Sequence, residues 1–74
     1  MESNTYKAIE YVAKIIECNT TELFEASKMH SHPKWDSLGH LSIMVKLEED
    51  YNIEINEETI TKYSEISNIA KILA

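Results

Sequence analysis

In this 74-residue sequence, the strongest candidate for a chemically modified or reactive residue is a single serine, Ser37. The stretch Trp35-Asp36-Ser37-Leu38 precedes a helical pattern, which places Ser37 at a helix start with its hydroxyl facing water. Free backbone N–H groups and the positive end of the helix dipole make such a position suitable for a phosphate. An N-cap role for Asp36 or Ser37 explains the same residues without any chemistry. From the tripeptide Asp36-Ser37-Leu38 alone, the cap is the simpler interpretation.

His40 lies one helical turn after Ser37, so a serine nucleophile with a histidine base can be considered. No third residue is evident to orient His40, no oxyanion hole can be named, and we expect both side chains to be exposed to solvent. We therefore predict no catalytic residue and a protein that is not an enzyme. His40 is then either a neighbour of a phosphate on Ser37 or an exposed histidine without a role.

Cys18, His30 and His32 are the remaining metal-ligating candidates. Their spacing matches no known ligand pattern, so we predict no metal site. Cys18 is interpreted as a small buried hydrophobic residue at the end of the first helix.

The amino-acid composition limits the classes of protein to which this sequence can belong. One glycine, one proline and one cysteine exclude a dinucleotide fingerprint, a P-loop and a disulfide framework. A net charge of −6 makes nucleic acid and anionic membranes poor partners. No apolar run reaches the length of a membrane span, and the first residues lack the features of a signal peptide. We expect a single domain over residues 1–74, monomeric and cytoplasmic.

Helical periodicity predicts an all-α fold, a small antiparallel bundle of three main helices plus one short helix, with a long first loop. The expected helices span residues 4–18, 37–51, 57–62 and 65–73. Asn19 is the predicted stop of the first helix, and Leu23 and Phe24 are expected to fix the long loop to the core. Ile53 and Ile55 alternate with polar residues, and we interpret them as an extended connector that plugs the core.

The predicted helix 37–51 has two opposed apolar stripes when its residues are placed at about 100° intervals. The first stripe contains Ile43, Met44, Leu47 and Tyr51. The second stripe contains Leu38, Leu41 and Val45 and is flanked by Ser42 and Glu49. A surface helix needs only one stripe for the core, so the second is either covered by another helix or exposed as a docking patch. The polar flanks favour the docking patch.

The whole net charge lies between Asp36 and Glu65, where eight acidic residues and two lysines give 2 − 8 = −6. Outside this segment, five acidic residues balance five lysines. A one-sided negative field beside an apolar stripe favours basic partners.

Asp36-Ser37-Leu38 is followed at fixed offsets by Leu41, by Val45 and by the run from Leu47 to Ile55. In these positions the sequence resembles an acyl carrier protein. The resemblance covers essentially the whole chain in length and helix order, and its specific part runs from Asp36 to Ile55.

The resemblance implies a carrier that holds an acyl or aminoacyl group as a thioester on a 4′-phosphopantetheine arm, which is attached to Ser37 from coenzyme A. It implies that partner enzymes dock on five positions, which are Asp36, Leu38, Leu41, Val45 and Glu49. Its partners would be a phosphopantetheinyl transferase, an acyl-loading ligase or synthase, and an acyl-accepting enzyme with a basic docking surface.

The sequence departs from the family pattern around the serine. Lys34 stands where the family commonly has glycine, Trp35 replaces a smaller residue, and Gly39 and Ser42 occupy positions that are often acidic. The stretch 35–40 resembles discrete carriers of specialised pathways, such as lipid, polyketide or surface polysaccharide biosynthesis, more than those of general fatty-acid synthesis. The alternative from another class is an acidic helical protein-interaction module that binds a basic partner without a prosthetic group.

Overall fold

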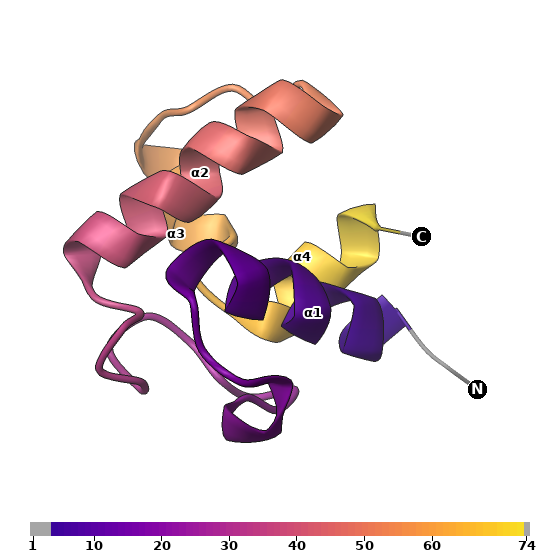
Figure 1. Ribbon diagram of the computed structural model, residues 1–74. Coiled ribbons are helices and arrows are strands. Elements are labelled where there is room, and N and C mark those ends of the chain that lie inside the picture. Colours follow the sequence, from indigo (N-terminus) through magenta and orange to yellow (C-terminus); the bar gives the residue numbers. More distant parts are fainter. Residues whose placement is uncertain (1–3, 74) are drawn as a thin grey trace.

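The computed structural model describes residues 4–73 and arranges four α-helices and one short 3₁₀ turn around a single apolar core (Figure 1). The elements are α1 (Asn4–Ile16), η1 (Thr20–Glu22), α2 (Ser37–Tyr51), α3 (Glu57–Lys62) and α4 (Ile66–Ile72). The predicted all-α bundle is confirmed, and the described residues contain no β-strand. α4 has only seven residues, so it is almost as short as α3 rather than a third main helix.

The first helix ends two residues earlier than the sequence predicts. Glu17 adopts a left-handed conformation with φ of 62°, and the Cys18 N–H donates to the Ala13 carbonyl at 3.0 Å. This is the Schellman arrangement that closes many helices. Asn19, which was the predicted stop, instead precedes η1 as its N-cap residue.

The bounds predicted for α2 and α3 are confirmed, and local hydrogen bonds explain them. α2 ends because Asn52 takes a left-handed conformation with φ of 56°, which asparagine tolerates better than most residues. The Asn56 side chain caps α3 by accepting a hydrogen bond from the Thr59 N–H at 2.9 Å. Ile53 and Ile55 form the expected extended connector and pack, half-buried, against the core.

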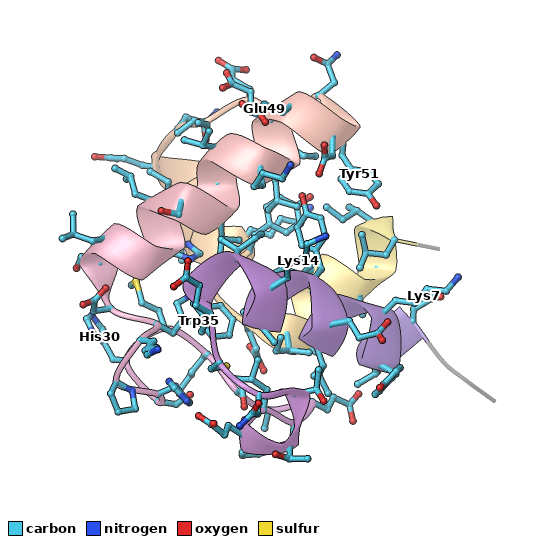
Figure 2. The ribbon with its side chains drawn as sticks, in the orientation of Figure 1. Lys7, Lys14, His30, Trp35, Glu49 and Tyr51 are labelled. Carbon is cyan, nitrogen blue, oxygen red and sulfur yellow. The ribbon has the colours of Figure 1, made fainter. Side chains whose placement is uncertain are left out.

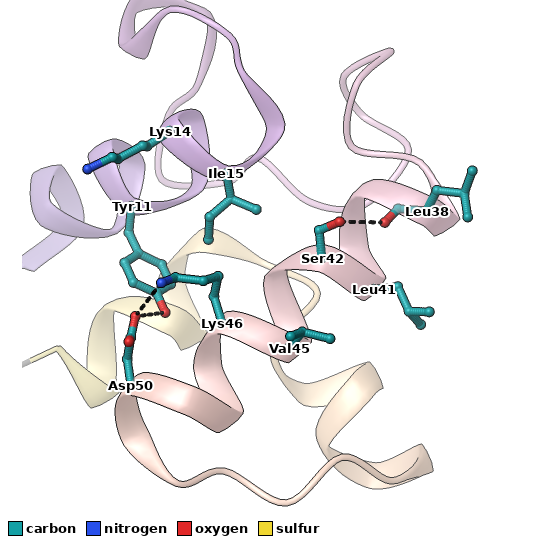
Figure 3. Close-up of a pocket in the computed structure, with 9 residues that line it drawn as sticks. All are labelled: Tyr11, Lys14, Ile15, Leu38, Leu41, Ser42, Val45, Lys46 and Asp50. Carbon is teal, nitrogen blue, oxygen red and sulfur yellow. Dashed lines mark hydrogen bonds and ion pairs between the residues drawn. The ribbon is translucent and has the colours of Figure 1, made fainter.

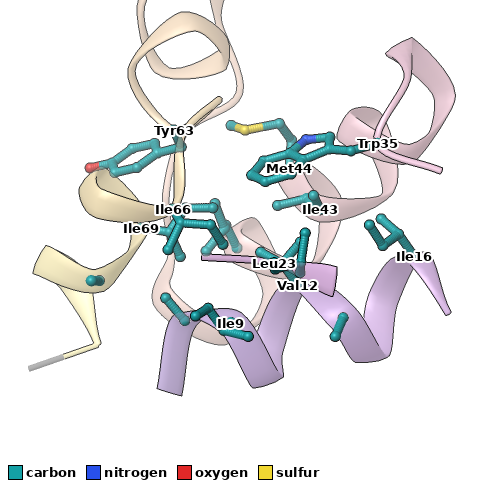
Figure 4. Close-up of a cluster of buried hydrophobic side chains, with 14 residues drawn as sticks. Ile9, Val12, Ile16, Leu23, Trp35, Ile43, Met44, Tyr63, Ile66 and Ile69 are labelled. Carbon is teal, nitrogen blue, oxygen red and sulfur yellow. The ribbon is translucent and has the colours of Figure 1, made fainter. Parts of the chain in front are cut away.

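The core lies where α1 packs against α4 and α2 (Figure 4). α2 runs opposite to α1, as Figure 1 shows. Every predicted core position of α1 is buried. The buried apolar residues are Ala8, Ile9, Val12, Ala13, Ile16, Leu23, Trp35, Ile43, Met44, Leu47, Tyr63, Ile66, Ile69 and Ala70. None of the helices in residues 4–73 is long and apolar enough to cross a bilayer.

The long loop between α1 and α2 is held to the core differently from the prediction. Leu23 is buried as expected, but the Phe24 side chain is 62% exposed and anchors nothing. Trp35, which has no exposed surface, provides the second anchor. The loop is also tied to the first residue of α4, because the Ile66 N–H donates to the Ser27 carbonyl at 2.9 Å. The end of this loop therefore has a fixed position when the chain enters α2.

Candidate functional site at the start of α2

Ser37 is the first residue of α2, and its side chain is exposed. The helix is capped by Asp36, whose Oδ1 accepts a hydrogen bond from the Gly39 N–H at 2.8 Å. Within residues 4–73, no hydrogen bond uses the Ser37 hydroxyl. The two interpretations left open by the sequence thus apply to different residues: Asp36 is the cap, and Ser37 presents a free hydroxyl beside the helix N-terminus.

Gly39 lets the preceding loop lie directly against the first turn of α2. A Cβ atom built on Gly39 would be 2.3 Å from the carbonyl oxygen of Lys34 and 3.4 Å from Oδ1 of Asp36. The first distance is far below any van der Waals contact, and the oxygen belongs to backbone that cannot rotate away. The single glycine of the chain therefore fixes the approach of the loop to the residues that surround Ser37.

His40 is buried, with 2% of its surface exposed, which contradicts the expected solvent exposure. Its Nδ1 accepts a hydrogen bond from the Trp35 indole Nε1–H at 3.1 Å, and its Nε2 lies 2.8 Å from the Ile60 carbonyl oxygen. The prediction of solvent exposure was wrong. His40 lies two residues after Leu38 in α2, so its side chain could point to the solvent or to the core, and only its packing against Trp35 and α3 selects the core.

These contacts define one protonation state for the ring. Nδ1 acts as an acceptor, so Nε2 carries the proton and donates to the Ile60 carbonyl. Burial lowers the pKa of His40, and the hydrogen bond to Ile60 opposes that shift only in part. Since both ring nitrogens are engaged inside the protein, His40 is not placed to take a proton from Ser37 or to touch a phosphate on it.

The second stripe of α2 is exposed, as the wheel predicts. Leu38, Leu41 and Val45 are 77%, 52% and 42% exposed, whereas Ile43 and Met44 on the opposite side have no exposed surface. Tyr51 lies on the stripe that is predicted to face the core, but it is 41% exposed, and its ring meets that of Tyr11 edge-on with centroids 6.0 Å apart.

The exposed stripe borders a groove between α1 and α2 with a volume of about 780 Å³ (Figure 3). The lining residues are Tyr11, Lys14, Ile15, Leu38, Leu41, Ser42, Val45, Lys46 and Asp50. At the end away from Ser37, the Tyr11 hydroxyl donates to Asp50 Oδ2 at 2.9 Å, and Lys46 Nζ lies 3.6 Å from the same oxygen. Burial raises the pKa of Tyr11, and the bond to Asp50 raises it further, so the phenol remains a donor.

The negative charge of the segment 36–65 lies largely on exposed side chains. Glu48, Glu49 and Asp50 are all exposed on the last turns of α2, with Glu49 and Tyr51 at the end of the helix away from Ser37 (Figure 2). Lys46 is 3.9 Å from Glu49 and 3.6 Å from Asp50, so one cation partly balances two carboxylates. Glu49, a predicted docking position, keeps 61% of its side chain exposed.

The structure brings Cys18 and His32 together, with Glu22 as a third group instead of His30. The possible ligand atoms of Cys18, Glu22 and His32 lie within 4.8 Å of one another, and Cys18 is half-buried rather than buried. His32 Nε2 is 2.5 Å from Glu22 Oε1, while its Nδ1 accepts a hydrogen bond from the Lys34 N–H at 3.0 Å. With Nδ1 used as an acceptor, Nε2 must carry the ring proton and donates it to Glu22. This hydrogen bond between His32 and Glu22 holds two parts of the loop together. Metal binding at Nε2 requires that proton on Nδ1 instead.

Neither a family model, nor a curated protein, nor a solved structure matches this chain in the three comparisons made with known proteins.

Proposed function

We propose that this protein is a carrier in which Ser37 is esterified by 4′-phosphopantetheine, whose terminal thiol holds an acyl group as a thioester. The observation that carries the proposal is the division of roles at the start of α2. Asp36 satisfies the helix cap, and the adjacent Ser37 hydroxyl is exposed and unused. A serine in this position suits a bulky modification because nothing in the fold depends on its oxygen.

The surroundings of Ser37 fit a phosphodiester. The N-terminus of a fifteen-residue helix offers backbone N–H groups and a positive dipole end to a phosphate. The loop is held close by the contact between Gly39 and the Lys34 carbonyl, so Ser37 has a defined position. The phosphodiester needs no side-chain pocket in this arrangement, because it remains exposed at the helix end.

Attachment of the arm is a phosphoryl-type transfer that requires a partner enzyme. The Ser37 oxygen forms a bond to the phosphorus that bears the pantetheine in coenzyme A, and the bond from that phosphorus to the second phosphate breaks. Adenosine 3′,5′-bisphosphate leaves, and the serine proton passes to the transferase. No residue of this chain is assigned a catalytic role in that step, since His40 is engaged with Trp35 and Ile60.

The exposed stripe and the acidic residues supply a surface for the partners. Leu38, Leu41 and Val45 give an apolar strip that starts beside Ser37, and exposed carboxylates such as Glu49 lie farther along α2. A basic enzyme surface would gain both hydrophobic contact and charge attraction there. The proposed partners are a phosphopantetheinyl transferase, an acyl-loading ligase or synthase, and an acyl-accepting enzyme. The protein would act as a monomer in a specialised biosynthetic pathway.

The test is to incubate the unmodified protein with coenzyme A and a broad-specificity phosphopantetheinyl transferase and to measure the intact mass. We expect one pantetheine adduct on the wild type and none on Ser37→Ala. Ser42→Ala is the matched control, because the Ser42 side chain is also exposed on α2 but its hydroxyl donates to the Leu38 carbonyl. The Ser42→Ala variant should gain the adduct on Ser37 as the wild type does. Absence of the adduct on the wild type, or equal modification of Ser37→Ala, would contradict the proposal.

The alternative, an acidic interaction module without a prosthetic group, uses the same stripe of α2. It predicts that a basic partner binds wild type and Ser37→Ala equally and that coenzyme A adds no mass. The free Ser37 hydroxyl favours the carrier, because a module that only binds a partner does not need it.

A further inference from the structure

Within residues 4–73, one group of three metal-ligating side chains lies close together, in the connection between α1 and α2. It consists of Cys18 just after α1, Glu22 at the end of η1 and His32 late in the loop. Their ligand atoms all lie within 4.8 Å of one another. A tetrahedral ion with bonds of about 2.0–2.3 Å holds its ligand atoms about 3.3–3.6 Å apart. Shifts on the order of 1 Å would therefore let the three side chains enclose an ion.

We infer that Cys18, Glu22 and His32 form a zinc site with one coordination position open to water. The inference goes beyond the proposed function and does not depend on Ser37. The set of donor atoms selects the ion, because thiolate, imidazole and carboxylate ligands together suit Zn²⁺, whereas Mg²⁺ and Ca²⁺ take oxygen ligands. The thiolate and the carboxylate supply two negative charges, which neutralise the two positive charges of the ion.

Local hydrogen bonds hold two of the ligands in place. The Cys18 N–H donates to the Ala13 carbonyl at 3.0 Å, which keeps this residue against the end of α1. The Glu22 N–H donates to the Asn19 carbonyl at 3.0 Å, and Glu22 Oε2 accepts from the Asn19 N–H at 3.4 Å. The other carboxylate oxygen, Oε1, faces His32. The ligand atoms are thus gathered before an ion binds, which lowers the entropic cost of binding.

A hollow of about 320 Å³ beside these side chains has room for a water ligand. Cys18 and Glu22 are part of its lining, and so is Lys34. The Lys34 ammonium donates to the Glu17 carbonyl at 2.8 Å. Its single positive charge opposes a cation in the hollow, but the two anionic ligands outweigh it.

Zinc binding would replace the hydrogen bond between His32 and Glu22. The pKa of Glu22 is lowered, chiefly by this hydrogen bond, so its side chain is already a carboxylate. Burial and the nearby Glu22 raise the pKa of Cys18, so the free protein holds a thiol, whose proton passes to water as the sulfur–zinc bond forms. The His32 ring proton moves from Nε2 to Nδ1 through solvent. The exposed Lys34 N–H then loses its acceptor on Nδ1 and bonds to water instead.

Cobalt tests the donor atoms, because Co²⁺ occupies tetrahedral zinc sites and absorbs visible light. The reduced protein is titrated with Co²⁺ and then with Zn²⁺. We expect one equivalent of Co²⁺ to produce a thiolate-to-cobalt charge-transfer band and the d–d bands of a tetrahedral ion, and Zn²⁺ to remove both. The charge-transfer band reports on Cys18 alone, since the chain has one cysteine. Absence of this band, or one ion shared by two chains in native mass spectrometry, would overturn the inference.

Glu22→Gln tests the carboxylate ligand without removing the acceptor for the His32 N–H, so the loop should keep its fold. We expect the affinity for Zn²⁺, measured by competition with a chromophoric chelator, to fall by more than the about 10–100-fold typical of groups behind a ligand. Glu25→Gln is the matched control, because Glu25 is exposed in the same loop and lies outside the cluster. Circular dichroism of the metal-free variants verifies the fold. Equal affinities in the two variants would contradict the site.

Long-range ¹H–¹⁵N spectra of the histidine rings test the third ligand. We expect Zn²⁺ to move the His32 ring proton from Nε2 to Nδ1, while His40 keeps its proton on Nε2 because both of its nitrogens are bonded inside the protein. A response of His30 in place of His32 would overturn the assignment. Ser37→Ala should bind Zn²⁺ as the wild type does, so a failure of the carrier proposal and a failure of the zinc site are distinguishable.

Discussion

The indole N–H of Trp35 donates to Nδ1 of His40 over 3.1 Å, and this bond joins the end of the long loop to the first turn of α2. The other ring nitrogen of His40 reaches the Ile60 carbonyl of α3 at 2.8 Å. Both side chains are buried, so each polar atom needs its partner to offset the loss of water. Through these two bonds, the helix turn that carries Ser37 is held to the loop on one side and to α3 on the other.

We expect the stability of the protein to fall below neutral pH because of His40. Burial lowers its pKa in the folded state, and a proton on Nδ1 would face the Trp35 N–H. The unfolded chain has an ordinary histidine pKa of about 6.5. As the pH falls through about 6.5, the unfolded state binds a proton that the folded state does not, so the free energy of unfolding decreases until the lowered folded-state pKa is reached. Above about pH 6.5 this contribution is fully present.

Urea unfolding at pH 7.5 and pH 5.5, followed by the fluorescence of Trp35, measures the effect. His40→Met removes the titrating group and should reduce the difference in unfolding free energy between the two pH values. The control is His30→Asn, because His30 is exposed and has φ of 75°, a conformation that asparagine tolerates. This variant should keep the wild-type pH dependence. Equal pH dependence in His40→Met and the wild type would show that His40 is not the cause.

Replacing Gly39, the only glycine of the chain, with alanine should lower the stability of the protein, whereas this substitution usually raises stability inside a helix. Glycine to alanine inside a helix normally stabilises by about 1 kcal/mol. At Gly39 the new Cβ would lie 2.3 Å from the Lys34 carbonyl oxygen, so the loop must move. We expect Gly39→Ala to destabilise the protein by about 1–3 kcal/mol, the usual cost of forcing atoms into a packed region.

Thermal and urea unfolding measure this change, with Ser42→Ala as the control on the exposed surface of the same helix. Ser42→Ala should be neutral or stabilise by about 0.5 kcal/mol, in line with helix propensity. A Gly39→Ala protein that is more stable than the wild type would refute the argument that loop and helix are in close contact.

The parts of the fold that local patterns determine were predictable from the sequence. The α1 face that contains Val12 and Ile16 follows from periodicity, and the cap of α3 follows from Asn56. The start of α2 at Ser37 is also determined by neighbouring residues, because Asp36 caps the helix within its first turn.

What the sequence could not determine depends on contacts between distant segments. The orientation of His40 depends on Ile60, which is twenty residues away. The hydrogen bond between Glu22 and His32 depends on how the long loop folds back. Phe24 and Trp35 are both aromatic residues in that loop, and only the packed structure selects Trp35 for the core. No periodic pattern in a loop carries this information.

Asp36 caps α2 and is also a proposed docking residue, and two substitutions distinguish these roles. Asp36→Ala removes the acceptor of the Gly39 N–H, so we expect a loss of about 0.5–2 kcal/mol of stability. Asp36→Asn keeps a good capping side chain and removes only the charge, so its stability should lie within about 0.5 kcal/mol of the wild type. If the charge also contributes to docking, transfer of the arm to Ser37 should be slower in Asp36→Asn. Wild-type transfer rates in that variant would limit Asp36 to its capping role.

The proposed docking role of the exposed stripe can be tested with charge substitutions that leave the core untouched. Leu41 and Val45 are 52% and 42% exposed, so Leu41→Glu and Val45→Glu should keep the helical circular dichroism and change the unfolding free energy by less than about 1 kcal/mol. Transfer of the arm to Ser37 should nevertheless slow severalfold, because a carboxylate would lose water when the partner covers the stripe. Phe24→Glu is the matched control, because Phe24 is 62% exposed and lies in the loop rather than on α2. Loss of helical structure in the stripe variants would mean that the stripe is core, and equal slowing in Phe24→Glu would mean that the effect is not specific to α2.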